Sequence, residues 1–136
     1  MKKIVLPIDG SARSQRTIAI TKQIFHGQDA EITLLMVLPE PRYTDAQAER
    51  DRATIQANQE LADFAKEFAG WKVKTVLLRG HPGPEIVQYA RDHGYDTLVM
   101  TRSSRGPLQK LGSVATYIVR NASFLDVIVM REEGDE

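Results

Sequence analysis

The chain has 136 residues, with 18 Lys and Arg residues balanced by 18 Asp and Glu residues, and it contains no cysteine. Its length and its 42% hydrophobic content are typical of one folded domain, so we expect a single domain over residues 1–136. The missing cysteine excludes disulfide frameworks and thiol catalysis. The balanced charge provides no net field to attract nucleic acid or an anionic membrane.

The first half of the chain alternates between short apolar runs and helical patterns. Residues 4–8 form a near-continuous apolar run that predicts a strand, and residues 14–25 follow with the spacing of an amphipathic helix. Residues 32–38 predict a second strand. Residues 44–68 predict a long helix with a polar first half and an apolar stripe that includes Ile55.

The second half repeats this alternation. Residues 73–78 predict a third strand, and residues 84–93 predict a helix with a proline in its first turn. Residues 97–100 and 127–130 predict the last two strands, with a helix over residues 113–121 between them. Near-continuous apolar strands of this kind are typical of a parallel sheet that is buried on both faces.

The element order βαβαβαβαβ predicts an α/β fold: a single five-stranded, mostly parallel sheet with helices on both faces. Residues 131–136 are net acidic, and we expect them to fray into solvent. No apolar run approaches the length of a membrane span or of a signal peptide, so a cytoplasmic protein is expected.

In an open parallel sheet, ligands bind beyond the carboxyl ends of the strands. The segment 101–113 follows the fourth strand, is rich in small residues, and ends where Gly112 and Ser113 open a helix. Its composition indicates a phosphate-binding loop, or else a flexible basic loop with a serine N-cap. The same two interpretations, phosphate neutralisation or a solvated surface, apply to its three cations, Arg102, Arg105 and Lys110.

Two further polar residues follow predicted strands. Asp9 comes after the first strand, where it would either hold a ribose hydroxyl or cap the turn into the first helix. His81 comes after the third strand and would border the same cleft. The sequence has neither a Gly-x-Ser-x-Gly elbow nor a Walker sequence, so we expect a protein that is not an enzyme, or one with at most weak ATP hydrolysis.

Four segments together carry a family resemblance, and they span almost the whole chain in the right order. They are residues 3–11, residues 97–100, residues 112–114, and residues 121–122 followed by 126–129, and with them the chain resembles the universal stress protein family. The resemblance implies a fold related to the adenine nucleotide α-hydrolases, and in some members binding of ATP or AMP, with Mg²⁺. It also implies a homodimer joined through the last strand, here Val127, Ile128, Val129 and Met130.

The resemblance carries over a set of nucleotide-site positions. Pro7 and Asp9 match positions around the adenine and ribose, and Val37 matches an adenine contact. The phosphate end is matched by Gly112, Ser113 and Val114. The whole set of expected nucleotide-binding residues is Pro7, Asp9, Val37, Met100, Thr101, Ser104, Arg105, Gly112, Ser113 and Val114.

The glycine motif of the nucleotide-binding members, Gly-x2-Gly followed nine residues later by Gly-Ser or Gly-Thr, is altered here. Thr101 and Ser104 occupy the two glycine positions, and residues 105–111 form a shorter spacer. An alternative alignment uses Ser103 and Gly106 and shortens the spacer further. A side chain in place of glycine obstructs close approach to a phosphate, although hydroxyl donors can compensate in part.

Two functions are therefore carried forward. In the first, the protein is a dimeric stress-response switch that binds an adenine nucleotide with an altered phosphate loop. In the second, it is a homodimeric interaction module of the same family that binds no nucleotide.

Overall fold

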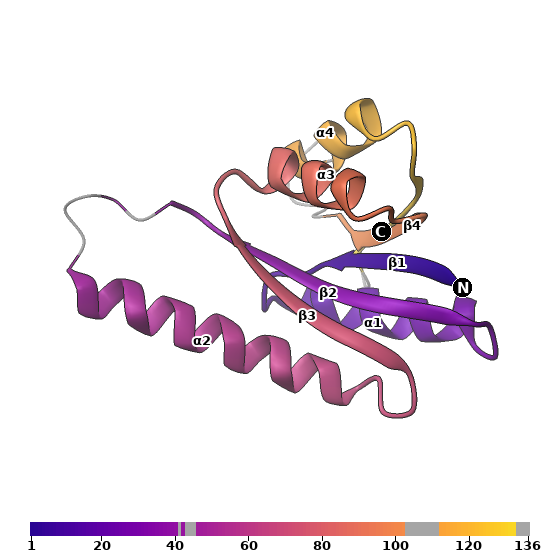
Figure 1. Ribbon diagram of the computed structural model, residues 1–136, viewed down its shortest axis with the longest axis horizontal. Helices are drawn as coiled ribbons and strands as arrows, with labels where there is room; N and C mark the ends of the chain where they lie inside the picture. The colour runs from indigo at the N-terminus through magenta and orange to yellow at the C-terminus, as the bar shows by residue number, and fades with distance from the viewer. Residues whose placement is uncertain (41, 43–45, 103–111, 133–136) are drawn as a thin grey trace.

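The computed structural model describes residues 1–40, 42, 46–102 and 112–132 (Figure 1). Strands and helices alternate along the chain as the sequence predicts, and the α/β fold class is confirmed. The elements are β1 (Lys2–Pro7), α1 (Ala12–Phe25), β2 (Ala30–Leu38), α2 (Gln47–Lys66), β3 (Lys72–Arg79), α3 (Pro82–Asp92), β4 (Thr97–Thr101), α4 (Ser113–Asn121) and β5 (Asp126–Met130).

The five strands form one sheet in the order β3-β2-β1-β4-β5, and every neighbouring pair is parallel. β1 lies at the centre, with β2 on one side and β4 on the other. The chain therefore builds the sheet outward in one direction through β2 and β3 and then in the other through β4 and β5. The carboxyl ends of β1 and β4 mark this change of direction, which is where open α/β sheets bind their ligands.

Helices cover both faces of the sheet, with α1 and α2 on one face and α3 and α4 on the other (Figure 1). The first face is packed by large buried side chains, among them Ile18, Leu61 and Phe68. The second face is packed by Ile86 and Ile118, together with smaller residues of α3 and α4. Apolar side chains thus cover the centre of the sheet on both sides.

Two expectations about burial were wrong. The strands β3 and β5 are only partly buried, because they form the two edges of the sheet and each pairs with one strand in the described chain. Ile55 does not belong to the buried stripe of α2, since its side chain is 57% exposed. The apolar face of α2 begins with Ala57 and Leu61, where the helix reaches the sheet.

The turn after β1 requires glycine. Gly10 has a φ of +79°, in the left-handed region that side chains other than glycine rarely adopt. An added Cβ would also lie 2.5 Å from a carboxylate oxygen of Glu60 on α2. This turn directs the chain from β1 into α1 and fixes where Asp9 lies.

The carboxyl-terminal end of the described chain is held on the protein, whereas fraying was expected for residues 131–136. The Arg16 Nε donates to the carbonyl oxygen of Arg131 at 2.7 Å, and Glu132 pairs with Arg13, so residues 131 and 132 contact α1. Residues 133–136 of the predicted tail lie outside the described residues. No helix in the described part of the chain has both the length and the apolar character that a membrane span needs.

Candidate functional site

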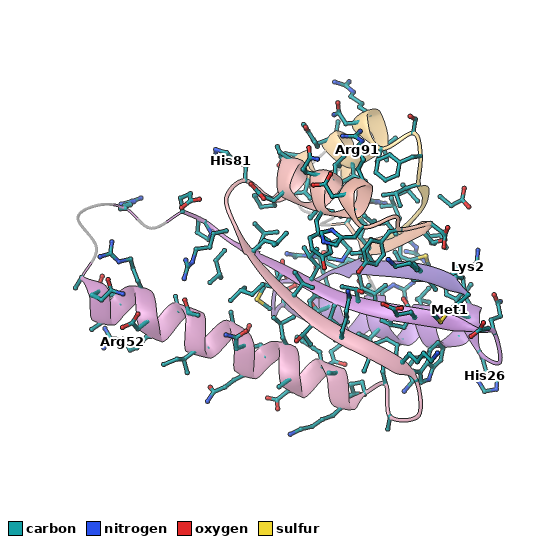
Figure 2. The ribbon with its side chains drawn as sticks, viewed as in Figure 1. Met1, Lys2, His26, Arg52, His81 and Arg91 are labelled. Carbon is teal, nitrogen blue, oxygen red and sulfur yellow. The ribbon has the colours of Figure 1, made fainter. Side chains whose placement is uncertain are left out.

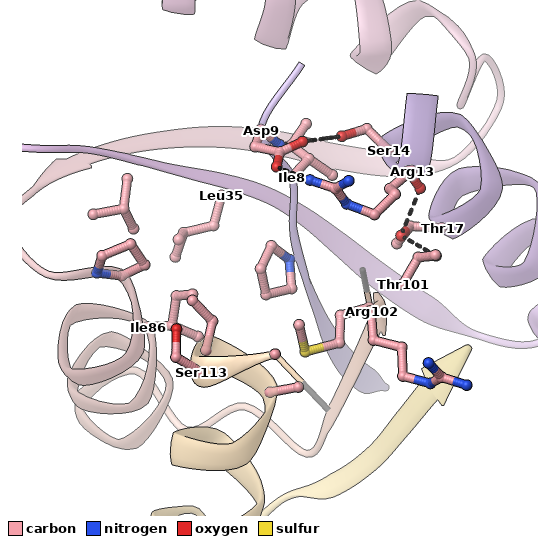
Figure 3. A pocket seen from close by; sticks show the side chains of 17 residues that line it. Ile8, Asp9, Arg13, Ser14, Thr17, Leu35, Ile86, Thr101, Arg102 and Ser113 are labelled. Atoms are coloured by element: carbon pink, nitrogen blue, oxygen red, sulfur yellow. Dashed lines mark hydrogen bonds and ion pairs between the residues drawn. The ribbon is translucent and has the colours of Figure 1, made fainter. Parts of the chain in front are cut away.

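A cavity of about 300 Å³ lies at the carboxyl ends of β1, β2 and β4, where the sheet changes direction (Figure 3). The first turns of α1, α3 and α4 complete its walls. Each of these helices follows a strand directly, so its amino end faces the carboxyl edge of the sheet. The cavity has the size of a small ligand pocket, at the lower end of the range seen for such sites.

The cavity brings together residues that are far apart in the sequence. Eight of the ten residues expected from the sequence line it: Pro7, Asp9, Val37, Met100, Thr101, Gly112, Ser113 and Val114. The other two, Ser104 and Arg105, lie outside the described residues, as do Lys110 and the alternative pair Ser103 and Gly106. His81 is exposed, points outward from the turn before α3 and does not line the cavity, whereas its neighbour Pro82 does (Figure 2).

One wall of the cavity is apolar. Leu35 and Val37 come from β2, Ile86 from α3 and Met100 from β4. Leu35 and Ile86 are almost completely buried, and Val37 is half-buried. Such a wall suits a flat apolar group, because its contact displaces water without leaving a polar group unpaired.

Asp9 supplies a carboxylate at the rim. Its Oδ1 accepts from the Ser11 backbone N–H at 3.0 Å and from the Ser11 hydroxyl at 2.5 Å, while its Oδ2 accepts from Arg13 at 3.2 Å. Burial raises the pKa of Asp9, but the hydrogen bonds from Ser11 and the charge of Arg13 lower it by more. The pKa of Asp9 therefore lies below its ordinary value, and the residue is a carboxylate at neutral pH. Both roles foreseen for Asp9 remain open, because it caps its turn and also lines the cavity.

Three residues of α1 line the cavity without having been predicted from the sequence. They are Arg13, Ser14 and Thr17, on the first two turns of the helix. Their spacing places them on one helix face, but the same spacing is typical of many surface helices, and only the packing of α1 against β1 and β4 directs that face to the cavity. The position of β4 beside β1, which sequence periodicity does not give, was the missing information.

Thr101 occupies the first glycine position of the motif, and its hydroxyl is hydrogen-bonded within the protein. Its Oγ1 lies 2.9 Å from the Oγ1 of Thr17, and both side chains are buried. Thr17 in turn donates its hydroxyl to the backbone oxygen of Arg13 at 3.2 Å. Since a hydroxyl has one proton, Thr101 must donate to Thr17. The proton of Thr101 is therefore already used within the protein.

Arg102 follows β4 and lines the cavity, but its guanidinium points away from Asp9 and Arg13 (Figure 3). Its backbone N–H donates to the Met130 oxygen at 2.8 Å. The Nη1 atom of Arg102 is buried and has no hydrogen-bond partner among the described residues. The cation that the structure directs to the cavity-lining carboxylate is thus Arg13.

The amino end of α4 forms the remaining wall. Gly112 is the N-cap, and Ser113, Val114 and Ala115 form the first turn, all four of them in the cavity lining. The first N–H groups of a helix have no partner within it and carry a partial positive charge. In this wall, backbone donors and a serine hydroxyl are available to an anion.

Comparisons with known proteins address the family and the fold of the chain. The family model described as the universal stress protein family matches residues 1–131. The universal stress protein MJ0531 of Methanocaldococcus jannaschii is 32% identical, over 99% of this chain and 85% of that protein.

Solved structures give the same result for the fold. The structure of MJ0577, described as a test case for assigning biochemical function from structure, superposes with a TM-score of 0.81 at 26% identity, covering 98% of this chain and 97% of that one. A universal stress protein family member of Arabidopsis thaliana with AMP bound superposes with a TM-score of 0.72 at 21% identity, covering 100% and 95%. The chain described here belongs to the universal stress protein family.

Proposed function

We propose that this protein binds an adenine nucleotide, ATP or AMP, in the cavity at the carboxyl edge of its sheet and acts as a homodimeric binding switch in a stress response. One observation supports the proposal above the others. All eight expected nucleotide-binding residues within the described chain line a single cavity, which combines an apolar wall, a carboxylate and a helix amino end. The AMP held by the Arabidopsis relative is consistent with that combination.

Each part of an adenine nucleotide has a suited partner in the cavity. The adenine ring would lie against the apolar wall beside Val37 and Met100, and the ribose hydroxyls would donate to Asp9. The phosphates would accept from the first turn of α4 at Ser113 and Val114. Among the described residues no group of three or more His, Cys, Asp or Glu is placed to hold a metal, so Mg²⁺ would arrive on the phosphates of the nucleotide.

Binding rather than catalysis is the activity we propose. A general base must accept a proton at neutral pH, and the low pKa of Asp9 makes it a weak base. Its Oδ1 is also occupied by Ser11. Any ATP hydrolysis in this cavity would therefore be slow.

The alternative function, an interaction module without nucleotide, is favoured by Thr101. Its hydroxyl is committed to Thr17, so it does not replace the donors of a glycine loop through its side chain. The two functions differ in one measurable property, which is whether the isolated protein binds ATP or AMP.

Isothermal titration of the protein with ATP-Mg²⁺ and with AMP tests the proposal. Micromolar binding is expected for the natural sequence. Gly112→Val should abolish it, because the added side chain blocks approach to the first turn of α4. No described atom lies within 4 Å of a Cβ added at Gly112, and its φ of −64° suits any residue, so the fold should remain intact.

Gly112→Ala serves as the matched, smaller substitution and should weaken binding less. Circular dichroism and thermal unfolding establish that both variants are folded. If the natural protein binds neither nucleotide and releases none on denaturation, the interaction module becomes the better function. If Gly112→Val leaves the affinity unchanged, the phosphates do not bind at the amino end of α4.

A further inference from the structure

Arg13 connects the cavity to the far end of the chain. Its Nη2 lies 3.2 Å from Oδ2 of Asp9, which follows β1, and its Nη1 lies 3.3 Å from Oε1 of Glu132, which follows β5. The Arg13 side chain is 24% exposed, so the guanidinium is largely shielded between the two carboxylates. Figure 3 shows it beside Asp9 at the cavity.

The segment that carries Glu132 is fixed on α1 by a second contact. Arg16, one helical turn after Arg13, donates from Nε to the Arg131 oxygen at 2.7 Å. The two arginines thus hold residues 131 and 132 across the first turns of α1. Arg16 itself does not line the cavity.

Arg13 is shared between two carboxylates, those of Asp9 and Glu132. An anionic ligand that pairs with Arg13 is repelled by both of them, so one carboxylate must give way. Asp9 is held in its own turn by the backbone and hydroxyl of Ser11, independently of Arg13. Glu132 lies on the segment after the last strand and takes no part in the cavity lining.

We propose that Arg13 selects anionic ligands for this cavity. A phosphate group would pair with Arg13 by displacing Glu132 from it. The inference rests on the proposed nucleotide function and adds its charge specificity. By linkage, an anion bound at Arg13 loosens residues 131–132, and a segment held tightly on α1 weakens anion binding by the same factor. Adenosine has no charge, so its binding does not require Glu132 to leave Arg13.

Titrations followed by amide chemical shifts of the first turn of α4 test this, with adenosine, AMP and inorganic pyrophosphate as ligands. Glu132→Gln keeps the size of the side chain and removes its charge. It should raise the affinity for AMP and for pyrophosphate about threefold and leave the affinity for adenosine unchanged, as expected for a partly exposed ion pair. Arg13→Met should weaken AMP about tenfold, the effect of losing a charge-assisted hydrogen bond.

Arg16→Met is the matched comparison, because it removes a guanidinium from the same helix but not from the cavity. Since it frees residues 131–132 from α1, it should raise the affinity for AMP relative to adenosine, whereas Arg13→Met lowers it. In the double variant Arg13→Met/Glu132→Gln, the effect of Glu132→Gln should vanish. An AMP-to-adenosine ratio that Glu132→Gln leaves unchanged, or an effect that survives in the double variant, overturns the inference.

The three ligands separate this inference from the proposed function. If adenosine and AMP bind equally well and Arg13→Met changes neither, the nucleotide function stands and the role of Arg13 is refuted. If only pyrophosphate binds, and more tightly in Glu132→Gln, Arg13 selects anions but the cavity does not take nucleosides. If none of the three binds, both proposals fail.

Discussion

Thr17 and Thr101 form a buried polar pair between α1 and β4. Their hydroxyls lie 2.9 Å apart, and the pair continues to the backbone oxygen of Arg13. This short chain of hydrogen bonds ties the end of β4 to the helix turn that carries Arg13. The threonine at the motif's glycine position is thus a packing partner of α1, which explains how the fold accommodates it.

Replacing Thr101 by valine should change stability but not nucleotide affinity. The hydroxyl is lost inside the protein and Thr17 loses its incoming donor, so the free energy of unfolding should fall by about 1 kcal/mol. The variant Thr17→Val/Thr101→Val, in which both partners become apolar, should be no less stable than Thr101→Val. Urea unfolding measures both values. A tenfold loss of ATP affinity in Thr101→Val would instead show that this hydroxyl serves the ligand.

At the scale of elements, α3 and α4 approach each other closely at Gly83. A Cβ added there would lie 2.9 Å from Cγ of Tyr117 and 3.0 Å from its Cβ and Cδ1. These atoms belong to the base of the tyrosine side chain, which cannot move without moving α4. Because both helices contribute their first turns to the cavity, this contact also sets the distance between two of its walls.

Gly83→Ala should therefore destabilise the protein, although alanine is the better helix former. The gain in helix propensity is about 1 kcal/mol at most, and overpacking costs about 1–3 kcal/mol. In a Tyr117→Gly background, which removes Cβ together with the ring, the clash is gone, so the same substitution should increase the free energy of unfolding. Denaturant unfolding of the four proteins gives the two differences. The same sign in both backgrounds would mean that Tyr117 is not the obstacle.

The elements themselves could be predicted from the sequence, since each strand is a short apolar run bounded by turn residues and each helix shows apolar residues at helical spacing. The order of strands in the sheet follows from which surfaces pack together, and a single sequence does not contain it. Because periodicity does not show which strands lie at the edges of the sheet, the apolar runs of β3 and β5 predicted buried strands, although both are edge strands.

The candidate site divides in the same way. The residues at or after the carboxyl ends of strands, such as Asp9, Val37 and Ser113, could be placed by the rule that ligands bind at the carboxyl edge. Arg13 and Glu132 could not, because their meeting depends on α1 and the end of β5 lying side by side. Contacts between elements far apart in the chain leave no periodic signal in the sequence.

At the scale of the whole molecule, β5 is an edge strand, and in the described chain it pairs with β4 alone. Asp126 donates its N–H to Asp96, and the Met130 oxygen accepts from Arg102, so both residues face β4. Alternate residues of a parallel strand form their backbone hydrogen bonds to opposite sides. Val127 and Val129 therefore direct their backbone groups outward, where a second copy could pair, and a two-fold axis there would cover the edge of both sheets.

Val129→Pro tests the proposed homodimer through this edge. Proline removes an outward N–H but leaves the ladder between β5 and β4 intact, and prolines are tolerated on edge strands. Light scattering at micromolar concentration should find the natural protein and Val129→Ala as dimers and Val129→Pro as a folded monomer. Val129→Ala controls for the smaller side chain, because it keeps the N–H. A natural protein that is monomeric at this concentration contradicts the homodimer, and a dimeric Val129→Pro places its interface elsewhere.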